Sequence, residues 1–142
     1  MILLDTNVIS ELVKPMPDAA VMAYFSQISP DALFTAAVCE AEIRYGLSRL
    51  PDGRRRAELS ARIDQFLEKG FPNQILAFDR LCARAYGEIR QLREIAGGPI
   101  TVEDAMILAT ARAYGAQAIA TRNTKDFEEC GIPLVDPWRS TR

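Results

Sequence analysis

Four acidic residues, spread widely along the chain, are the side chains best suited to chemistry. A compact α/β fold would gather them at one edge of its sheet: Asp5, Glu42, Asp104 and Asp126. Carboxylates that share a pocket repel one another and are costly to desolvate, and a hard divalent cation with oxygen ligands keeps them ionised. The chain has no histidine, so acid–base catalysis by imidazole is excluded, and hydrolysis by a water that a metal ion activates fits better. The acids predict a magnesium-type site.

The length and composition are those of one ordinary globular domain. The chain has 142 residues, 49% of them hydrophobic and 25% charged, and we expect a single domain over residues 1–142. No apolar run approaches the ~18 residues of a membrane span, and no basic leader precedes the first apolar segment, so we expect a cytoplasmic protein outside the membrane. The three cysteines form no CxxC pair, which argues against a disulfide framework or a zinc site.

The charge balance limits how the protein can bind a polyanion. A formal net charge of −2 and a pI near 5.2 argue against binding of nucleic acid through overall positive charge. Any such contact must come from local basic groups. The candidates are Arg54, Arg55, Arg56, Arg80, Arg84, Arg90, Arg93, Arg122, Lys125, Arg139 and Arg142. For any one arginine taken alone, a solvated helix face is the simpler interpretation.

Short apolar segments alternate with amphipathic ones along the chain. The strand candidates are residues 1–5, 32–36, 74–78, 117–121 and 134–135. The first helix candidate begins near Thr6 and ends before Pro15, and the others cover 18–27, 38–50, 54–68, 79–95 and 101–113. This alternation predicts a parallel sheet with helices on both faces, and ligands bind such sheets at the carboxyl ends of the strands.

Apolar spacing predicts which faces of two of the helices are buried. In the helix over 38–50 the stripe consists of Cys39, Ile43, Leu47 and Leu50. In the helix over 79–95, which Asp79 can cap, it consists of Leu81, Ala85, Ile89 and Leu92. The turn signal at 51–53 predicts that the helices on either side of it form a hairpin.

Two of the four acids have structural alternatives at helix starts. Asp5 could cap the helix that follows it, a role worth ~1 kcal/mol, although the Thr-Asn pair after it could do so instead. Asp104 completes TVED, the outline of a capping box, where an acid also complements the helix dipole by ~0.3–1 kcal/mol. Glu103 can serve the dipole equally well, which would leave Asp104 free to face inward.

The other two acids, Glu42 and Asp126, could simply be solvated surface side chains. Glu42 lies at the edge of an apolar stripe, whereas Glu40 has Arg44 one turn further on as a surface partner. Asp126 lies in a charged loop with Glu128, where a solvated side chain is the simpler interpretation. Taken by itself, Asp126 therefore has the weakest case.

Several motifs taken together resemble a known family. They are MILLDTNVISE at the start, CEAEIRYG with Glu42, TVEDAMILATA with Asp104, TRNTKDF with Asp126, and the terminal Asp136-Pro137-Trp138. In this order and spacing they resemble the PIN-domain ribonucleases, most closely the VapC toxins and, among these, the FitB-like branch. The resemblance extends over essentially the whole chain.

This resemblance implies a three-layer α/β/α sandwich with a central parallel sheet, and cleavage of single-stranded RNA that depends on Mg²⁺ or Mn²⁺. It gives Asp5, Glu42 and Asp104 as the first three acids. Many relatives carry the fourth directly after the Thr-Arg pair, where this chain has Asn123, with Asp126 three residues later. Because an asparagine supplies no charge and cannot act as a base, a one-metal site is the firmer expectation.

The roles expected of these residues follow from the chemistry of magnesium, which binds few protein ligands and retains several waters. We expect Asp5 and Asp104 to bind the metal directly, and Glu42 to position or deprotonate the attacking water. Asp126 is the fourth catalytic candidate: either it takes over the work of the fourth acid, or the second metal position is weak. Supporting contacts to a second metal, a water or the pocket are expected from Thr6, Thr121 and Asn123.

The resemblance also implies partners. A VapC-type toxin has a cognate antitoxin whose C-terminal segment occupies the active-site groove, often with a basic side chain near the acids, and an arginine can pair with carboxylates there. Such toxins commonly form homodimers, and toxin with antitoxin commonly binds operator DNA through the antitoxin. The acidic pI agrees with leaving the DNA contact to the partner.

Two other functional classes of protein also fit parts of the sequence. A phosphoacceptor receiver domain also has a parallel α/β sheet, acids at strand ends and Mg²⁺. It ordinarily needs a paired acid cluster early in the chain and an acceptor aspartate after a middle strand, and residues 32–78 offer neither in an apolar strand context. A non-catalytic binding module would keep the acidic groove for a protein partner, with hydrolysis disabled by Asn123.

Overall fold

Five short parallel strands form the centre of the molecule. The computed structural model describes residues 1–139, so the predicted basic candidate Arg142 lies outside the described residues. The strands are β1 (Ile2–Leu4), β2 (Leu33–Ala36), β3 (Ile75–Leu76), β4 (Ala118–Ala120) and β5 (Leu134–Val135). They pair in the order β3-β2-β1-β4-β5, and every pairing is parallel. The predicted parallel sheet is therefore confirmed.

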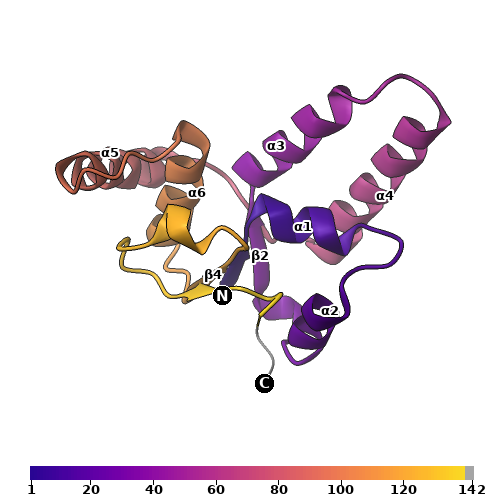
Figure 1. The fold of residues 1–142 in the computed structure, drawn as a ribbon, viewed down its shortest axis with the longest axis horizontal. Coiled ribbons are helices and arrows are strands. Elements are labelled where there is room, and N and C mark those ends of the chain that lie inside the picture. The colour runs from indigo at the N-terminus through magenta and orange to yellow at the C-terminus, as the bar shows by residue number, and fades with distance from the viewer. Residues whose placement is uncertain (140–142) are drawn as a thin grey trace.

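Helices cover both faces of this sheet. They are α1 (Thr6–Leu12), α2 (Ala19–Ser26), α3 (Ala37–Ser48), α4 (Arg54–Gly70), α5 (Arg80–Ile95) and α6 (Val102–Ala113), with 3-10 turns η1 (Pro30–Ala32) and η2 (Thr124–Phe127). Figure 1 shows α5 and α6 on one side of the strands and α1 to α4 on the other. This arrangement confirms the predicted α/β/α sandwich. None of the helices within residues 1–139 is long and apolar enough to cross a membrane, and the cytoplasmic location stays a prediction.

The alternation of side chains along each strand builds two cores. Leu3 of β1 and Ile119 of β4 are buried in the core that contains α5 and α6. Leu4 and Ala120, the next residue in each strand, are buried in the core that contains α1, α3 and α4. Because successive side chains of a strand point to opposite faces, each of these short apolar strands stabilises both layers at once.

The strand order reverses its direction at β1, and this creates the crevice of the molecule. From β1 the sheet extends through β2 to β3 on one side and through β4 to β5 on the other. Leu4 pairs with both Thr35 and Ala120, so the carboxyl ends of three strands lie level. Ligands of open α/β sheets bind at such a switch point. The same order departs from the flavodoxin-like 2-1-3-4-5 order of receiver domains, which argues against that alternative.

The predicted hairpin of helices is confirmed by α3 and α4, which project together from the sheet (Figure 1). Gly53 caps α4 with a φ of 149°, a backbone conformation that favours glycine. Arg44 of α3 joins the two helices, because its Nη1 donates to Oδ1 of Asp64 at 2.5 Å and its Nε donates to Glu40 at 3.1 Å. The predicted surface pair of Glu40 and Arg44 is thus also present.

The predicted buried face of α5 is wrong at two of its four positions. Leu81 and Leu92 are 61% and 57% exposed, whereas Cys82, Ala85 and Ile89 are buried. The buried stripe follows an i, i+3, i+7 spacing that begins one residue later than predicted, because Leu81 and Cys82 are both apolar and the packing of the helix buries Cys82. Two leucines of α5 consequently lie on the surface.

Candidate active site

Asp5 lies at the carboxyl end of β1, where the chain turns directly into α1. Its side chain is only 4% exposed. Oδ1 accepts the backbone N–H of Thr6 at 2.7 Å, and Oδ2 accepts the hydroxyl of Thr121, at the end of β4, at 2.8 Å. Asp5 therefore does cap α1, as its structural alternative supposed, and it also lies at the switch point of the sheet.

Asn7 ties these two strand ends together, a role that the sequence did not reveal. Its amide Nδ2 donates to Oδ2 of Asp5 at 3.3 Å, and its Oδ1 accepts the backbone N–H of Arg122 at 3.2 Å. Thr121 in turn accepts the backbone N–H of Asn123 at 3.0 Å. In the sequence, Asn7 is only a polar residue two positions after the acid at the end of a strand, and such a residue could equally well be a helix cap.

Glu42 reaches the same region from α3. It is half-buried, and its Oε1 accepts the hydroxyl of Thr6 at 2.5 Å. Thr6 therefore connects the first two predicted acids, because its backbone N–H holds Asp5 while its side chain holds Glu42. Thr6 and Thr121 both contact the acids in this structure.

Asp104 enters from the opposite layer, in the first turn of α6. Thr101 caps this helix by accepting the backbone N–H of Asp104 at 3.2 Å. The cap is thus supplied by a threonine, and Glu103 is exposed beside it. The half-buried carboxylate of Asp104 lines the same cavity as Asp5 and Glu42.

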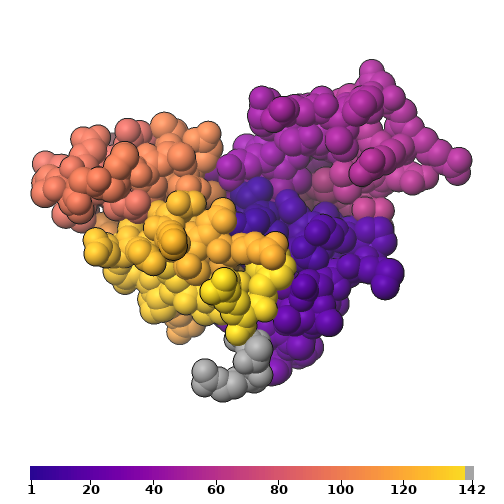
Figure 2. Space-filling model, in the orientation of Figure 1, coloured from indigo at the N-terminus to yellow at the C-terminus, as the bar shows by residue number. Residues whose placement is uncertain are grey.

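One cavity of about 430 Å³ brings together side chains from both layers of helices. Its acids are Asp5, Glu42, Asp104 and Glu11, and its other charged or aromatic residues are Lys14, Arg122 and Trp138. In Figure 2 the surface is notched between α5 and α6 on one side and the α3–α4 hairpin on the other. Three of the four predicted acids, from segments far apart in the sequence, therefore share one cavity.

Asp126 does not line this cavity. Its side chain is exposed and lines a neighbouring cavity of about 440 Å³. Between Asn123 and Asp126 the chain makes a 3-10 turn, closed by a hydrogen bond from the backbone N–H of Asp126 to the carbonyl of Asn123 at 3.1 Å. The turn carries Asp126 away from Asp5, whereas Asn123 lies on the wall that the two cavities share.

The electrostatics of the cavity disfavour three bare carboxylates. The pKa of Asp5 is raised to about 6, chiefly by burial and also by the nearby charges of Asp104 and Glu42, while the hydrogen bonds from Thr121 and Thr6 act to lower it. Burial also raises the pKa of Asp104, and the charges of Asp126 and Glu42 add to this. A cation bound among these groups would favour their ionised forms and so counteract both shifts.

The donor set fits a hard divalent cation that keeps most of its waters. Within residues 1–139, no group of three cysteine, aspartate and glutamate side chains is close enough to enclose a metal ion by itself. In the same part of the chain, Asp5, Glu42 and Asp104 form no ion pair with a lysine or arginine. Carboxylates without an ion-pair partner in a shared cavity suit magnesium, which binds through one or two carboxylates and water, better than they suit an all-protein cage.

Glu11 is a second residue of the cavity that the sequence did not single out. It is 7% exposed, and its carboxylate accepts Nζ of Lys14 and the backbone N–H of Asp18, each at 2.8 Å. These hydrogen bonds lower the pKa of Glu11. Because both of its oxygens are occupied, Glu11 fixes the segment between α1 and α2 at the edge of the cavity. In the sequence, the only indication of this role was the i, i+3 spacing of Glu11 and Lys14, which predicts an ion pair.

Comparison with known proteins identifies the family to which this fold belongs. The PIN domain family profile matches residues 2–132, and the chain belongs to the PIN-domain family. It is 38% identical to VapC ribonuclease Y4jK of Sinorhizobium fredii (strain NBRC 101917 / NGR234), over 97% of this chain and 98% of that protein. It is 35% identical to Toxin FitB of Neisseria gonorrhoeae (strain ATCC 700825 / FA 1090), over 97% and 99% of the two chains.

Solved structures agree with this placement. The structure of FitAB bound to an IR36 DNA fragment superposes with a TM-score of 0.90 and 34% sequence identity, over 100% of this chain and 99% of that one. The similarity to VapC- and FitB-type proteins that the motifs indicated is therefore confirmed over nearly the full length of the chain.

Proposed function

We propose that this protein is the toxin of a type II toxin–antitoxin system and an endoribonuclease that hydrolyses single-stranded RNA with the help of a divalent cation. The observation that carries the proposal is the shared cavity of Asp5, Glu42 and Asp104 at the switch point of a PIN-domain sheet. The relatives named VapC ribonuclease and Toxin FitB, each matched over nearly the whole chain, support it.

Asp5 and Asp104 are the residues proposed to hold the cation, which we take to be Mg²⁺, with Mn²⁺ as a substitute. When bound, such an ion polarises a phosphodiester oxygen and makes a coordinated water more acidic. Asp5 is suited to this role because Thr6 and Thr121 fix both of its oxygens. Asp104 is suited because Thr101 caps α6 through the backbone N–H of Asp104, and the half-buried carboxylate lines the cavity.

Glu42 is proposed to orient the attacking water and to accept its proton. The hydroxyl of Thr6 donates to Oε1 and sets the orientation of the carboxylate. Within residues 1–139 no group donates a hydrogen bond to Oε2, and this oxygen is therefore the one proposed to receive the proton from water.

A single cation suits the cavity better than two. Asn123 adds no negative charge to it, and Asp126 lines the neighbouring cavity. Asp126 influences Asp104 through its charge, since it contributes to the raised pKa of Asp104. We therefore assign Asp126 and Asn123 an indirect effect on the proposed metal site and no direct coordination.

The proposed partners are an RNA substrate, a cognate antitoxin and, through the antitoxin, operator DNA. A relative named as a toxin and the DNA-bound FitAB structure support the antitoxin and the DNA. A homodimer and a single domain over residues 1–142 also belong to this proposal.

The test is hydrolysis of single-stranded RNA by the purified full chain in the presence of Mg²⁺. Asp5→Asn and Asp104→Asn should each abolish cleavage, and EDTA should do the same. Asp31→Asn is the matched control, because Asp31 is an exposed aspartate outside the cavity. Retained activity in both site variants, together with no effect of EDTA, would show that this assignment is wrong.

A further inference from the structure

A second cavity adjoins the one that contains the acids. Its volume is about 440 Å³, and Arg122, Asn123 and Trp138 line both cavities and so form the wall between them. Beyond this wall it is lined by η2 and by the segment that follows β5. A polymer lying across the acids could therefore continue into the second cavity.

The charges of the second cavity favour an anion. Its cations are Arg122, Lys125 and Arg139, and its acids are Asp126 and Asp136. Asp136 is already engaged, because it accepts the backbone N–H of Trp138 at 3.0 Å and pairs with Arg139 at 3.8 Å. Among residues 1–139, no carboxylate lies within ion-pair distance of Arg122 or Lys125. These two cations are therefore available to a phosphate.

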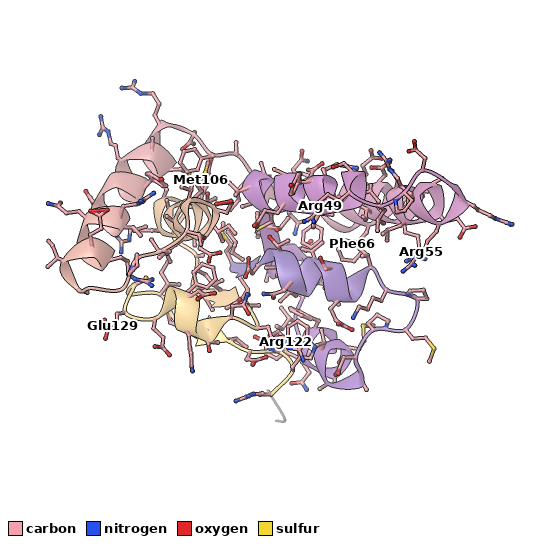
Figure 3. The ribbon with its side chains drawn as sticks, turned by 45° about the horizontal axis from the view of Figure 1, so that its top comes forward. Arg49, Arg55, Phe66, Met106, Arg122 and Glu129 are labelled. Atoms are coloured by element: carbon pink, nitrogen blue, oxygen red, sulfur yellow. The ribbon has the colours of Figure 1, made fainter. Side chains whose placement is uncertain are left out.

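Arg122 is held in place from two directions. Its guanidinium carbon lies 4.6 Å from the centre of the Trp138 ring, a cation–π contact that orients the planar group. Its backbone N–H donates to Oδ1 of Asn7, which also contacts Asp5. Figure 3 labels Arg122 where the C-terminal segment, in faint yellow, meets the violet N-terminal helices. Arg122 is exposed, and these two contacts position its cation relative to the acids.

The other cation that lines the acid cavity, Lys14, is not available in the same way. Lys14 is paired with Glu11 at 2.8 Å. Because the whole chain carries a formal net charge of −2, a polyanion needs a local cationic contact to approach the acids at all. Arg122 and Lys125 supply that contact on the side of the second cavity.

We infer that the second cavity is the subsite for the RNA backbone next to the scissile phosphodiester, where Arg122 contacts the adjoining phosphate and Lys125 a further one. Trp138 acts as a positioning residue, because its ring holds the guanidinium of Arg122. This inference rests on the proposed ribonuclease function. It adds the direction in which the strand leaves the acids and the residues that contact its backbone.

The experiment measures binding separately from cleavage. The full chain carrying Asp5→Asn, in EDTA, is titrated with a short fluorescein-labelled 2′-O-methyl oligoribonucleotide at several salt concentrations. Arg122→Ala and Lys125→Ala, added to this parent, should each weaken binding by about tenfold, as for the loss of one charge-assisted hydrogen bond. Each should also reduce the slope of log K against log salt by about 0.7, the value for one phosphate contact on a single strand.

The control is Arg54→Ala, which removes the same charge from a site on α4 outside both cavities, where the side chain is 92% exposed and pairs with Glu58. It should leave both the affinity and the salt slope unchanged. Arg122→Lys should keep the slope but lower the affinity, because lysine keeps the charge and loses the planar contact. Trp138→Leu should weaken binding in the parent and have no further effect when Arg122→Ala is already present.

The outcomes separate this inference from the proposed function. Salt slopes for Arg122→Ala and Lys125→Ala that equal the slope for Arg54→Ala would overturn the subsite, even if the unmodified protein cleaves RNA in Mg²⁺. An unmodified protein that fails to cleave RNA, while the two variants still lose salt dependence, would contradict the ribonuclease and leave the binding subsite in place.

Discussion

Oδ2 of Asp5 accepts a hydrogen bond from the hydroxyl of Thr121 at 2.8 Å, across 116 positions of sequence. This contact joins the ends of β1 and β4, the two strands that flank the switch point of the sheet. It supports the ionised form of a carboxylate that burial would otherwise protonate. The state of Asp5 is thus set by a balance between desolvation and a few neutral donors.

That balance predicts how stability depends on pH. The pKa of Asp5 is raised from 3.8 to about 6, so between these values the folded protein binds more protons than the unfolded chain. The free energy of unfolding of the metal-free protein should therefore fall as the pH rises through this range, by about 3 kcal/mol in all. The measurement is a series of denaturant titrations in EDTA at different pH values, on the unmodified protein and on Asp5→Asn. The difference between their free energies of unfolding should change with pH. A pH-independent difference for Asp5→Asn would contradict the raised pKa.

The same shift predicts the pH dependence of cation binding. A carboxylate must lose its proton before it can bind a metal, so affinity for Mn²⁺ should fall as the pH drops below about 6, the pKa of Asp5. Calorimetry in buffers of different ionisation enthalpy should also detect protons released on binding near that pH. Affinity that stays constant from neutral pH to well below the pKa would show that Asp5 is not a ligand.

Thr121→Val should weaken the site and the fold together. The change removes the hydroxyl that donates to Asp5 and accepts the backbone N–H of Asn123, and the loss of a buried hydrogen bond costs about 1–3 kcal/mol. The pKa of Asp5 should rise further and its affinity for Mn²⁺ should fall.

Thr110→Val is the matched control for this experiment. Thr110 is equally buried, and its hydroxyl donates to the carbonyl of Met106 within α6 at 2.8 Å. It should lower the free energy of unfolding without changing Mn²⁺ affinity. Equal metal affinities in the two variants would mean that the contact with Asp5 does not support the site.

Glu42→Gln should separate catalysis from metal binding. The amide keeps the size of the side chain but cannot accept a proton, and the loss of a general base typically lowers kcat by roughly 10²- to 10⁴-fold. Mn²⁺ affinity should change little, because Glu42 is proposed to act on water. Glu40→Gln, on the same helix but paired with Arg44, should keep full activity. Cleavage at the unmodified rate by Glu42→Gln would remove Glu42 from the mechanism.

Asn123→Asp should strengthen the site, and the same series tests the alternative of a non-catalytic binding module. Asn123 lines the acid cavity, so a carboxylate there adds a negative charge and an oxygen ligand, and Mn²⁺ affinity or stoichiometry should rise in calorimetry. Asp126→Asn should have only a small effect, because Asp126 lines the second cavity. If neither the unmodified protein nor Asn123→Asp binds Mn²⁺ or Mg²⁺, the cavity is a protein-binding groove and not a catalytic one.

Much of the fold could be predicted from local patterns. The capping signals of α1 and α6, the proline-terminated first helix and the alternation of apolar runs with helices correspond to elements within a few residues of their observed bounds. Capping and apolar spacing depend on residues within one or two helical turns of each other, so the local sequence is enough to predict these elements. The rotation of α5 was predicted wrongly because Leu81 and Cys82 are both apolar, and only packing selects between them.

The sequence by itself determined the order of strands and helices, the family, and the three acids at the starts of helices or the end of a strand. Only the tertiary structure decided which side chains share a cavity: Asp126 is excluded, while Asn7, Glu11 and Arg122 are included or tied to it. The physical reason is that each local signal acts over a few residues, whereas membership of the site depends on the lateral order of the strands. Placing β4 beside β1 brings Thr121 to Asp5, and no pattern within either segment contains that information.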